Sequence, residues 1–291
     1  MKHFLILFAL VNSIVALSQE KGKLSRRYTS LDNYKKNYNK ALTKKDSLNL
    51  IVIDSITFIL IEEIETSNIK GKSVLYEYKD DTFLNIYKKI AFNHKNNSFS
   101  NRTQMKYWNQ DINFYFSESI PKKTKRQFLK FAKTIVSEID SLKVNEVKSV
   151  KNSNYIVYYS QDYEYEDRMS NSKESQYWMY WKHNCLIYKN AIKIKTDNLF
   201  NEKLRLQKMK IYFIESLGYF KYNTQLDCEH FFSGCYQKDV KLSKFDKEIL
   251  KYHYSYGICK GTSIQDFEEQ HLSAKKLLKE TNITTRILHN Y

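Results

Sequence analysis

Two adjoining periodicities between residues 112 and 142 constrain the fold of this chain most strongly. The segment INFYF alternates its apolar side chains at Ile112, Phe114 and Phe116, which is typical of a strand with one buried face. Pro121, the only proline in the chain, stands where a helix begins, because its missing N–H costs nothing at the first helical position. Apolar residues then recur with helical spacing at Phe128, Phe131, Ala132, Ile135, Ile139 and Leu142. The pattern predicts a strand followed by a helix of about five or six turns.

The segments that follow predict further strands. Residues 154–159 (NYIVYY), 176–181 (QYWMYW) and 185–195 (CLIYKNAIKIK) are rich in β-branched and aromatic residues, and we expect the last two to pair. The polar segment 161–175 has no apolar period, so we expect a long exposed loop there. A strand, a long helix and further strands predict an α+β fold with a mixed sheet packed by two long helices.

The second of these helices is expected over residues 199–218. Its apolar side chains recur every three or four residues, and Gly218 would end it in the left-handed conformation. The C-terminal part is expected to be helical. Ser243 and Asp246 resemble a capping box, and Thr262 or Ser263 would cap a last helix.

The N-terminus has the pattern of a secretory signal peptide. An apolar stretch from Phe4 to Val15 precedes Ala16-Leu17-Ser18, which places small residues before a cleavage site at Gln19. The stretch is too short to span a membrane. We therefore expect an exported chain, periplasmic or secreted, with no transmembrane segment after cleavage.

We divide the chain into a signal peptide at 1–18, an N-terminal region of unclear fold at 19–104 and an α+β domain at 105–285. Within the N-terminal region, residues 48–65 are apolar for too long to alternate cleanly. They form either a buried helix or two strands.

The net charge of +16 suggests a nucleic-acid partner, but the distribution of the basic residues disfavours one. Lys, Asn, Ile, Tyr and Phe are abundant together, a mixture expected from an AT-rich genome whatever the function. The densest basic runs are residues 21–45 and 122–133, and the second lies on the predicted amphipathic helix, where a solvated face is the ordinary explanation. We predict no nucleic-acid binding.

Four cysteines follow the signal peptide, and an even number in an exported chain suggests two disulfides. Cys228 and Cys235 bracket a short loop, so we pair them, and we pair Cys185 with Cys259 by elimination. A zinc site formed by Cys228, His230 and Cys235 is the rival interpretation, although the spacing is not that of a known zinc finger.

The order of elements over roughly residues 105–280 resembles the zincin-like half of metzincin peptidases. There a strand and a long helix precede further strands, one strand leads into the metal-binding helix, that helix ends at a glycine, and a loop and a late helix complete the core. Here KNAIKIK would be the strand, RLQKMKIYFIESLGYF the helix and LSKFDKEILKYHYSYG the late helix.

The chain also resembles an uncharacterised bacterial exported family, domain of unknown function 2927. Its members show a helix ending in a leucine-glycine pair, a loop, and a D-x-x-x-L-x-x-x-Y helix followed by a glycine. The positions that fit are Leu217, Gly218, Asp246, Leu250, Tyr254 and Gly257.

The peptidase motif H-E-x-x-H-x-x-G is not present on the expected metal helix. Aligned on Gly218, its first histidine falls on Ile211, its general-base glutamate on Tyr212 and its second histidine on Glu215. Zinc hydrolysis needs two imidazoles one helical turn apart and a carboxylate that takes a proton from the bound water. Ile211 cannot bind a metal, and a phenol with a pKa of about 10 is a poor base. The resemblance therefore implies a fold that has lost its metal, and we expect no metal and no cofactor.

Our first hypothesis is an exported, non-catalytic binding domain with a degenerate metallopeptidase-like fold. In peptidases of this type an extended peptide adds to the edge strand beside the metal helix, so an extended peptide or an envelope component is the expected partner. The binding residues would be Tyr212, Glu215, Trp178 and Trp181.

Two alternatives stay open. One is an exported hydrolase with a rebuilt site, in which Glu215, His253 or His230 supplies the acid/base group. The other is a basic cell-envelope interaction protein whose Lys-rich segment 19–47 contacts anionic polymers. The missing zinc motif favours a protein that is not an enzyme.

Overall fold

The computed structural model describes residues 28–38, 42–44, 47, 50–53, 55–60, 71–92, 103–139, 141–235, 239 and 241–290. The chain divides into two units, Met1–Asn68 with Leu277–Thr285 and Ile69–Lys276 with Arg286–Tyr291. The expected signal peptide at residues 1–18 lies outside the described residues. Across the described ranges, no helix is long and apolar enough to cross a membrane.

The first unit contains a small antiparallel sheet and a short helix. Its elements are β1 (Tyr28–Ser30), α2 (Leu31–Tyr38), β2 (Leu50–Ile53) and β3 (Ile56–Leu60). The strands lie in the order β1-β3-β2, and Ser55, with a φ of 67°, occupies the turn between β2 and β3. Over its described residues, the apolar segment 48–65 therefore forms two strands, which is the second of the two alternatives.

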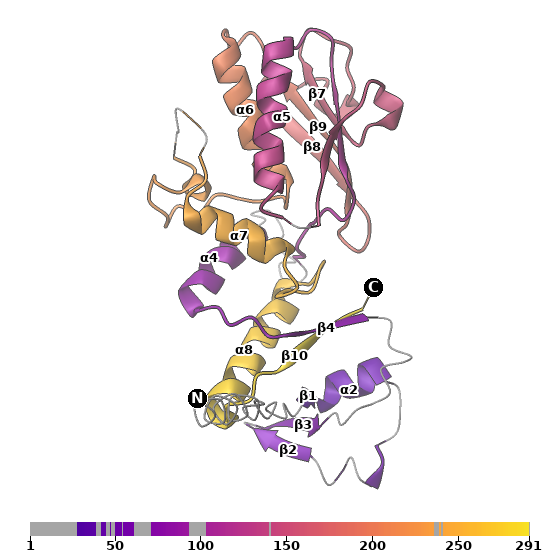
Figure 1. Cartoon of the computed structure of the whole chain (residues 1–291), viewed down its shortest axis with the longest axis vertical. Helices are drawn as coiled ribbons and strands as arrows, with labels where there is room; N and C mark the ends of the chain where they lie inside the picture. The colour runs from indigo at the N-terminus through magenta and orange to yellow at the C-terminus, as the bar shows by residue number, and fades with distance from the viewer. Residues whose placement is uncertain are drawn as a thin grey trace, which may run out of the picture. The chain divides into compact units, whose positions relative to one another are not determined.

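A five-stranded mixed sheet organises the second unit (Figure 1). Its strands are β5 (Ile112–Phe116), β6 (Val144–Glu146), β7 (Tyr155–Tyr159), β8 (Gln176–Trp181) and β9 (Ile187–Ile194). They lie in the order β6-β5-β7-β9-β8, with β8 antiparallel to β9 and the other neighbours parallel. The predicted strands are confirmed, and the mixed sheet with its helices confirms the α+β fold.

Two helices, α5 (Lys122–Val136) and α6 (Glu202–Ser216), lie side by side against this sheet (Figure 1). Phe114 of β5, Phe128 of α5 and Phe213 of α6 contact one another with ring centroids 5.3 to 5.8 Å apart. All three side chains are fully buried. This triangle of aromatic rings fixes both helices on the sheet.

Helix α5 differs from its predicted extent at both ends. Pro121 is the N-cap residue, with φ −58° and ψ 141°, and so stands one position before the first helical residue. The helix ends at Val136 rather than near Leu142, yet Ile139 and Leu142 are only 3% and 5% exposed. The apolar stripe outlasts the helix because the turn that leads into β6 also packs against the core.

The segment 161–175 is a largely exposed loop, as its polarity predicted, but it is anchored at Glu166 and Met169, which are buried. It contains the 3₁₀ helix η4 (Asp167–Met169), and Met169 is fully buried against Ile156 and Tyr158 on the second face of the sheet. Lys193 of β9 donates to the Met169 carbonyl oxygen at 2.8 Å, which fastens the segment. Met169, the ring of Tyr165 and a set of hydrogen bonds hold the segment, and such a combination leaves no apolar period in the sequence.

The remaining elements belong to the second unit, except that the end of α8, residues 277–281, falls in the first unit. They are β4 (Gly71–Leu75), α4 (Asp81–Phe92), η3 (Val150–Asn152), η5 (Phe231–Ser233), α7 (Lys244–Tyr254), α8 (Ile264–Thr281) and β10 (Arg286–Asn290). Strands β4 and β10 pair antiparallel. The capping box of Ser243 and Asp246 is confirmed at the start of α7, and Ser263 caps α8 by accepting from the Asp266 N–H. Strand β4 and helix α4 precede the expected domain start at residue 105 but belong to the second unit.

Candidate functional site

Aromatic residues and one carboxylate gather where β8 meets the C-terminal half of α6. We call this surface the β8–α6 face and define it by Tyr177, Trp181, Tyr212, Glu215, Tyr219 and Tyr222. The rings of Tyr177 and Tyr212 lie 5.4 Å apart, and those of Trp181 and Tyr219 lie 5.5 Å apart. The Tyr212 hydroxyl also donates to the Ser175 carbonyl oxygen just before β8. These contacts tie the strand to the helix.

Glu215 is the only carboxylate of this face. Its side chain accepts a hydrogen bond from the Tyr222 hydroxyl. Burial raises the pKa of Glu215 above its ordinary value of 4.5, although the Tyr222 hydrogen bond and Lys208 oppose the shift. Burial likewise raises the pKa of Tyr177, of Tyr212 and of Tyr222, and the Glu215 carboxylate raises all three further. The face therefore presents neutral phenols around a partly desolvated carboxylate.

Replacing Glu215 by glutamine is expected to stabilise the protein near neutral pH. The folded protein holds the Glu215 proton to a higher pH than the unfolded chain does, so the free energy of unfolding falls as the pH rises from about 4.5 through the raised pKa. Glutamine does not ionise, so the variant avoids this fall in the free energy of unfolding. It should therefore be more stable than the wild type at about pH 7, whereas below about pH 4, where Glu215 is protonated in both states, it should have no advantage. Unfolding in urea at both pH values measures the difference.

Glu138→Gln is the matched control for that comparison. Hydrogen bonds from Lys251 and Lys247 lower the pKa of Glu138, so its ionised form is favoured in the folded protein. This control should therefore lose stability at neutral pH. An unchanged or lower stability of Glu215→Gln at neutral pH would contradict the desolvated state of Glu215.

The two tryptophans predicted as binding residues lie on opposite faces of the sheet. Trp181 is 41% exposed, belongs to the β8–α6 face and has the Lys106 ammonium 5.2 Å from its ring. Trp178 packs on the other face beside Ile156 and Met169, with Arg168 over its ring at 5.5 Å. Trp178 follows Tyr177 directly in β8, so its side chain points to the other face of the sheet, and the register of β8 shifts only beyond it, between Tyr180 and Trp181. The structure thus brings Trp181, Tyr212 and Glu215 together and places Trp178 apart from them.

The turn that ends α6 corrects the expected role of Gly218. Tyr219, with a φ of 56°, is the left-handed residue, and the Phe220 N–H donates to the Glu215 carbonyl oxygen at 2.9 Å. Gly218 is needed for close packing instead. A Cβ atom at this position would lie 2.3 Å from Phe220 Cζ and 2.9 Å from His253 Nε2.

His253 is a buried structural residue. Its Nε2 lies 2.8 Å from the Lys106 carbonyl oxygen, which can only accept, so the proton is on Nε2. Its Nδ1 then accepts from the Tyr87 hydroxyl at 3.0 Å. Burial lowers the pKa of His253 to about 3, and the positive charge of Lys260 adds to this shift. The imidazole is neutral, and both of its nitrogens are satisfied within the core.

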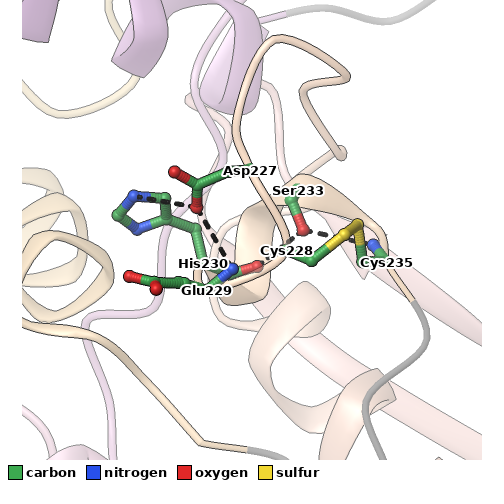
Figure 2. Close-up of a disulfide and its surroundings, with 6 residues drawn as sticks. All are labelled: Asp227, Cys228, Glu229, His230, Ser233 and Cys235. Atoms are coloured by element: carbon green, nitrogen blue, oxygen red, sulfur yellow. Dashed lines mark hydrogen bonds and ion pairs between the residues drawn. A yellow bond between two sulfur atoms is a disulfide. The ribbon is translucent and has the colours of Figure 1, made fainter.

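His230 lies in the disulfide loop, between Cys228 and Cys235 (Figure 2). Its Nδ1 is 3.0 Å from Ser243 Oγ, its Nε2 is 3.7 Å from Asp227, and its ring contacts Phe245. The predicted disulfide between Cys228 and Cys235 is confirmed in the same loop (Figure 2).

The predicted pairing of Cys185 with Cys259 is wrong, because both are free thiols with separate surroundings. The Cys185 thiol donates to Gln104 Oε1 at 3.0 Å, and Lys106 Nζ lies 3.4 Å from the sulfur. Cys259 packs against a small cluster formed by Tyr76, Ala274 and Ile287, where burial raises its pKa. An even number of cysteines does not show that the buried Cys185 and the partly buried Cys259 each have separate neighbours.

The confirmed disulfide yields a stability prediction. Replacing Cys228 and Cys235 by serine is expected to lower the free energy of unfolding by about 2–3 kcal/mol, because the bond closes a short loop in the unfolded chain. Urea unfolding with and without a reductant measures this. Reduction should destabilise the wild type to the same extent and leave the double variant unaffected. An unchanged unfolding midpoint of the reduced wild type would contradict the bond.

The positions aligned with the peptidase motif all lie on α6. Ile211, Tyr212 and Glu215 occupy them, and Ile211 is partly buried against the core. Within the described part of the chain, no group of three or more His, Cys, Asp or Glu side chains is placed to hold a metal ion. Sequence reasoning missed Tyr219 and Tyr222 of the β8–α6 face, although their aromatic side chains directly beyond Gly218 were a usable signal.

Comparison with known proteins adds no family to these observations. No protein-family model matches the chain, and no curated protein sequence is significantly similar to it. The arguments that follow therefore depend on the geometry of this chain alone.

Proposed function

We propose that this protein is an exported, non-catalytic binding domain with a degenerate zincin-like fold, and that it binds an extended peptide along β8. The observation that carries the proposal is the position of β8. It is an edge strand of the five-stranded sheet, and no described strand pairs with its outer side. The exposed ring of Trp181 and the carboxylate of Glu215 lie beside that edge.

The order of elements supports the zincin-like part of the proposal. Strand β5 and the long helix α5 come first, further strands follow, and β9 leads into α6. Helix α6 ends just before Gly218, and a loop and the late helix α7 complete the succession. This is the succession that the resemblance to metzincin peptidases implies.

The physical chemistry of an edge strand supports an extended peptide as the ligand. Every second residue of an edge strand directs its N–H and C=O away from the sheet, and these groups pair readily with another extended chain. Aromatic rings beside such an edge supply apolar contact area, and aromatic residues are enriched among those that contribute most to binding. The half-exposed rings of Trp181 and Tyr222 meet that description.

The alternative of a rebuilt hydrolytic site depends on Glu215. His253 is buried and neutral, so it cannot exchange a proton with a substrate. His230 contacts Ser243 in another part of the unit. Of the three predicted acid/base residues, Glu215 is therefore the one that lies on the β8–α6 face. Titration of the purified protein with Zn²⁺ separates the two functions. We expect no stoichiometric zinc binding by the wild type. Stoichiometric zinc that is lost in Glu215→Ala would refute the proposal and favour the hydrolase.

Peptide binding is tested directly by hydrogen exchange. Short synthetic peptides are first selected from a random library by capture on the wild-type protein. When bound, they should slow the exchange of backbone amide hydrogens in β8.

Trp181→Ala should weaken the affinity for these peptides by about tenfold, because it removes one well-placed aromatic contact. Phe200→Ala is the matched control, because Phe200 is 80% exposed and lies outside the β8–α6 face. Protection of other strands without β8, or equal losses in both variants, would contradict edge pairing.

A further inference from the structure

A row of five basic residues lines a groove on the outer side of α5, next to β6. We call this row the basic stripe and define it by Lys122, Lys125, Arg126, Lys130 and Lys133. Leu129, Thr134 and Glu146 complete the described lining, and Glu146 belongs to β6. Strand β6 is at one edge of the sheet and β8 at the other, so the groove is separate from the proposed peptide site.

The stripe follows from the helical spacing of the sequence. Its members stand at positions i, i+3, i+4, i+8 and i+11, which places them on one side of a helix over about 16 Å. The buried residues of α5, including Phe128 and Ala132, face the sheet instead. Helix α5 has no acidic residue, so its own side chains do not neutralise the stripe.

Other elements contribute little negative charge to the stripe, and Glu146 of β6 is the one acidic residue in its described lining. Within the described residues, none of its five cations forms an ion pair, whereas elsewhere in the unit cations commonly do. Lys247 and Lys251 both contact Glu138, and Lys88 contacts Glu268. Basic residues in the first turn of a helix also oppose the helix dipole. An amphipathic helix needs a polar outer face, and a mixture of acidic, basic and neutral residues would provide one. Solvation of the outer face of α5 therefore does not explain why all five charged residues of the basic stripe are positive.

We propose that the basic stripe binds a linear anionic polysaccharide. Fixed cations about one helical turn apart along a groove match a chain that carries an anionic group on successive sugar units. The described lining contains no aromatic ring, and single-stranded nucleic acids rely on aromatic stacking, so the groove fits a sugar chain better. A membrane surface is flat and does not fill a groove. The Glu146 carboxylate bounds the groove on the β6 side and would repel an anion that strayed from the stripe.

Binding of heparin, used as a probe for anionic polysaccharides, tests this assignment in the full mature chain. Lys130→Glu/Lys133→Glu should weaken heparin binding by about tenfold or more at moderate salt, because it removes two attractive charges and adds two repulsive ones. Lys151→Glu/Lys244→Glu makes the same change in net charge at two exposed residues elsewhere on the unit and should change binding by less than about twofold. Thermal unfolding of each variant checks that the fold is intact, and Lys130→Gln/Lys133→Gln gives a milder second test.

Four results would overturn the assignment. Equal losses in the two charge-reversed variants would show that net charge alone binds heparin. Tighter binding of oligo(dT), abolished by the same stripe substitutions, would assign the stripe to nucleic acid. Tighter binding of phosphatidylglycerol vesicles, abolished in the same way, would assign it to a membrane. If Lys130→Glu/Lys133→Glu and Lys130→Gln/Lys133→Gln both bound heparin as tightly as the wild type, the groove could not be the heparin site. Trp181→Ala should leave heparin binding unchanged, so this outcome is independent of the proposed peptide site.

Discussion

Replacing Asp246 by alanine is expected to lower the free energy of unfolding by about 3–5 kcal/mol. The carboxylate is fully buried and accepts from the backbone N–H groups of Phe231 at 2.9 Å, Phe232 at 3.4 Å and Ser243 at 2.8 Å. Alanine would leave these donors without an acceptor, at a cost of about 1–3 kcal/mol for each that stays buried, and would break the capping box of α7. Unfolding in urea, followed by circular dichroism, measures the loss.

Asp266→Ala is the matched control, because Asp266 has the same place in the first turn of α8. There the carboxylate is exposed, and its contact is with the Ser263 hydroxyl at 2.7 Å. We expect this variant to lose less than about 1 kcal/mol, since water replaces the lost contact. Equal losses in the two variants would mean that Asp246 is merely a helix cap and does not anchor the disulfide loop.

Gly218→Ala is expected to lower the free energy of unfolding by about 2–3 kcal/mol, because overpacking a close contact in a core forces its neighbours to move. The added Cβ would meet Phe220 at 2.3 Å and His253 at 2.9 Å. Both of these side chains are buried, and His253 is held by two hydrogen bonds. The turn that positions Tyr219 and Tyr222 would shift, so the variant should also weaken peptide capture on the β8–α6 face.

Gly257→Ala distinguishes close packing from a general effect of removing glycine. Its added Cβ would approach Glu77 Oε2 at 2.7 Å and Ser255 Oγ at 3.0 Å, and both atoms end side chains that can rotate into water. Gly257 is buried, and the added Cβ would also lie 3.1 Å from Cε2 of the buried Tyr252 ring. The expected loss is about 1 kcal/mol, smaller than for Gly218→Ala because this approach to buried atoms is less close. A Gly218→Ala variant as stable as Gly257→Ala would show that the α6 turn tolerates a side chain.

The regular parts of the second unit could be predicted because their side chains show a clear period. The alternation at Ile112, Phe114 and Phe116 predicts β5, and the stripe through Phe128 predicts α5. Local capping chemistry likewise predicts the start of α7 at Ser243. Such signals arise from contacts between near neighbours in sequence, and tertiary packing does not override them here.

The missed features depend on contacts between distant segments. The anchoring of Met169 depends on Lys193, and the left-handed Tyr219 depends on the room that Gly218 leaves for Phe220. The free thiol of Cys185 depends on Gln104, which lies far away in sequence. None of these relations leaves a period or a motif, so a single sequence cannot predict them.

The candidate site was predicted in part. Tyr212 and Glu215 followed from alignment on Gly218, and the structure places Trp181 on the same face. Trp178 and Trp181 are both predicted binding residues on one strand, and the structure places their rings on opposite faces of the sheet.

The central claim is that the β8–α6 face retains peptide binding without hydrolysis. The most direct measurement is incubation of the purified protein with short random synthetic peptides in the presence of Zn²⁺, followed by mass spectrometry of the bound and free fractions. The account predicts that retained peptides are recovered intact and that methylation of alternate backbone nitrogens releases them. Cleaved fragments that disappear with Glu215→Ala, or the absence of any retained peptide, would contradict it.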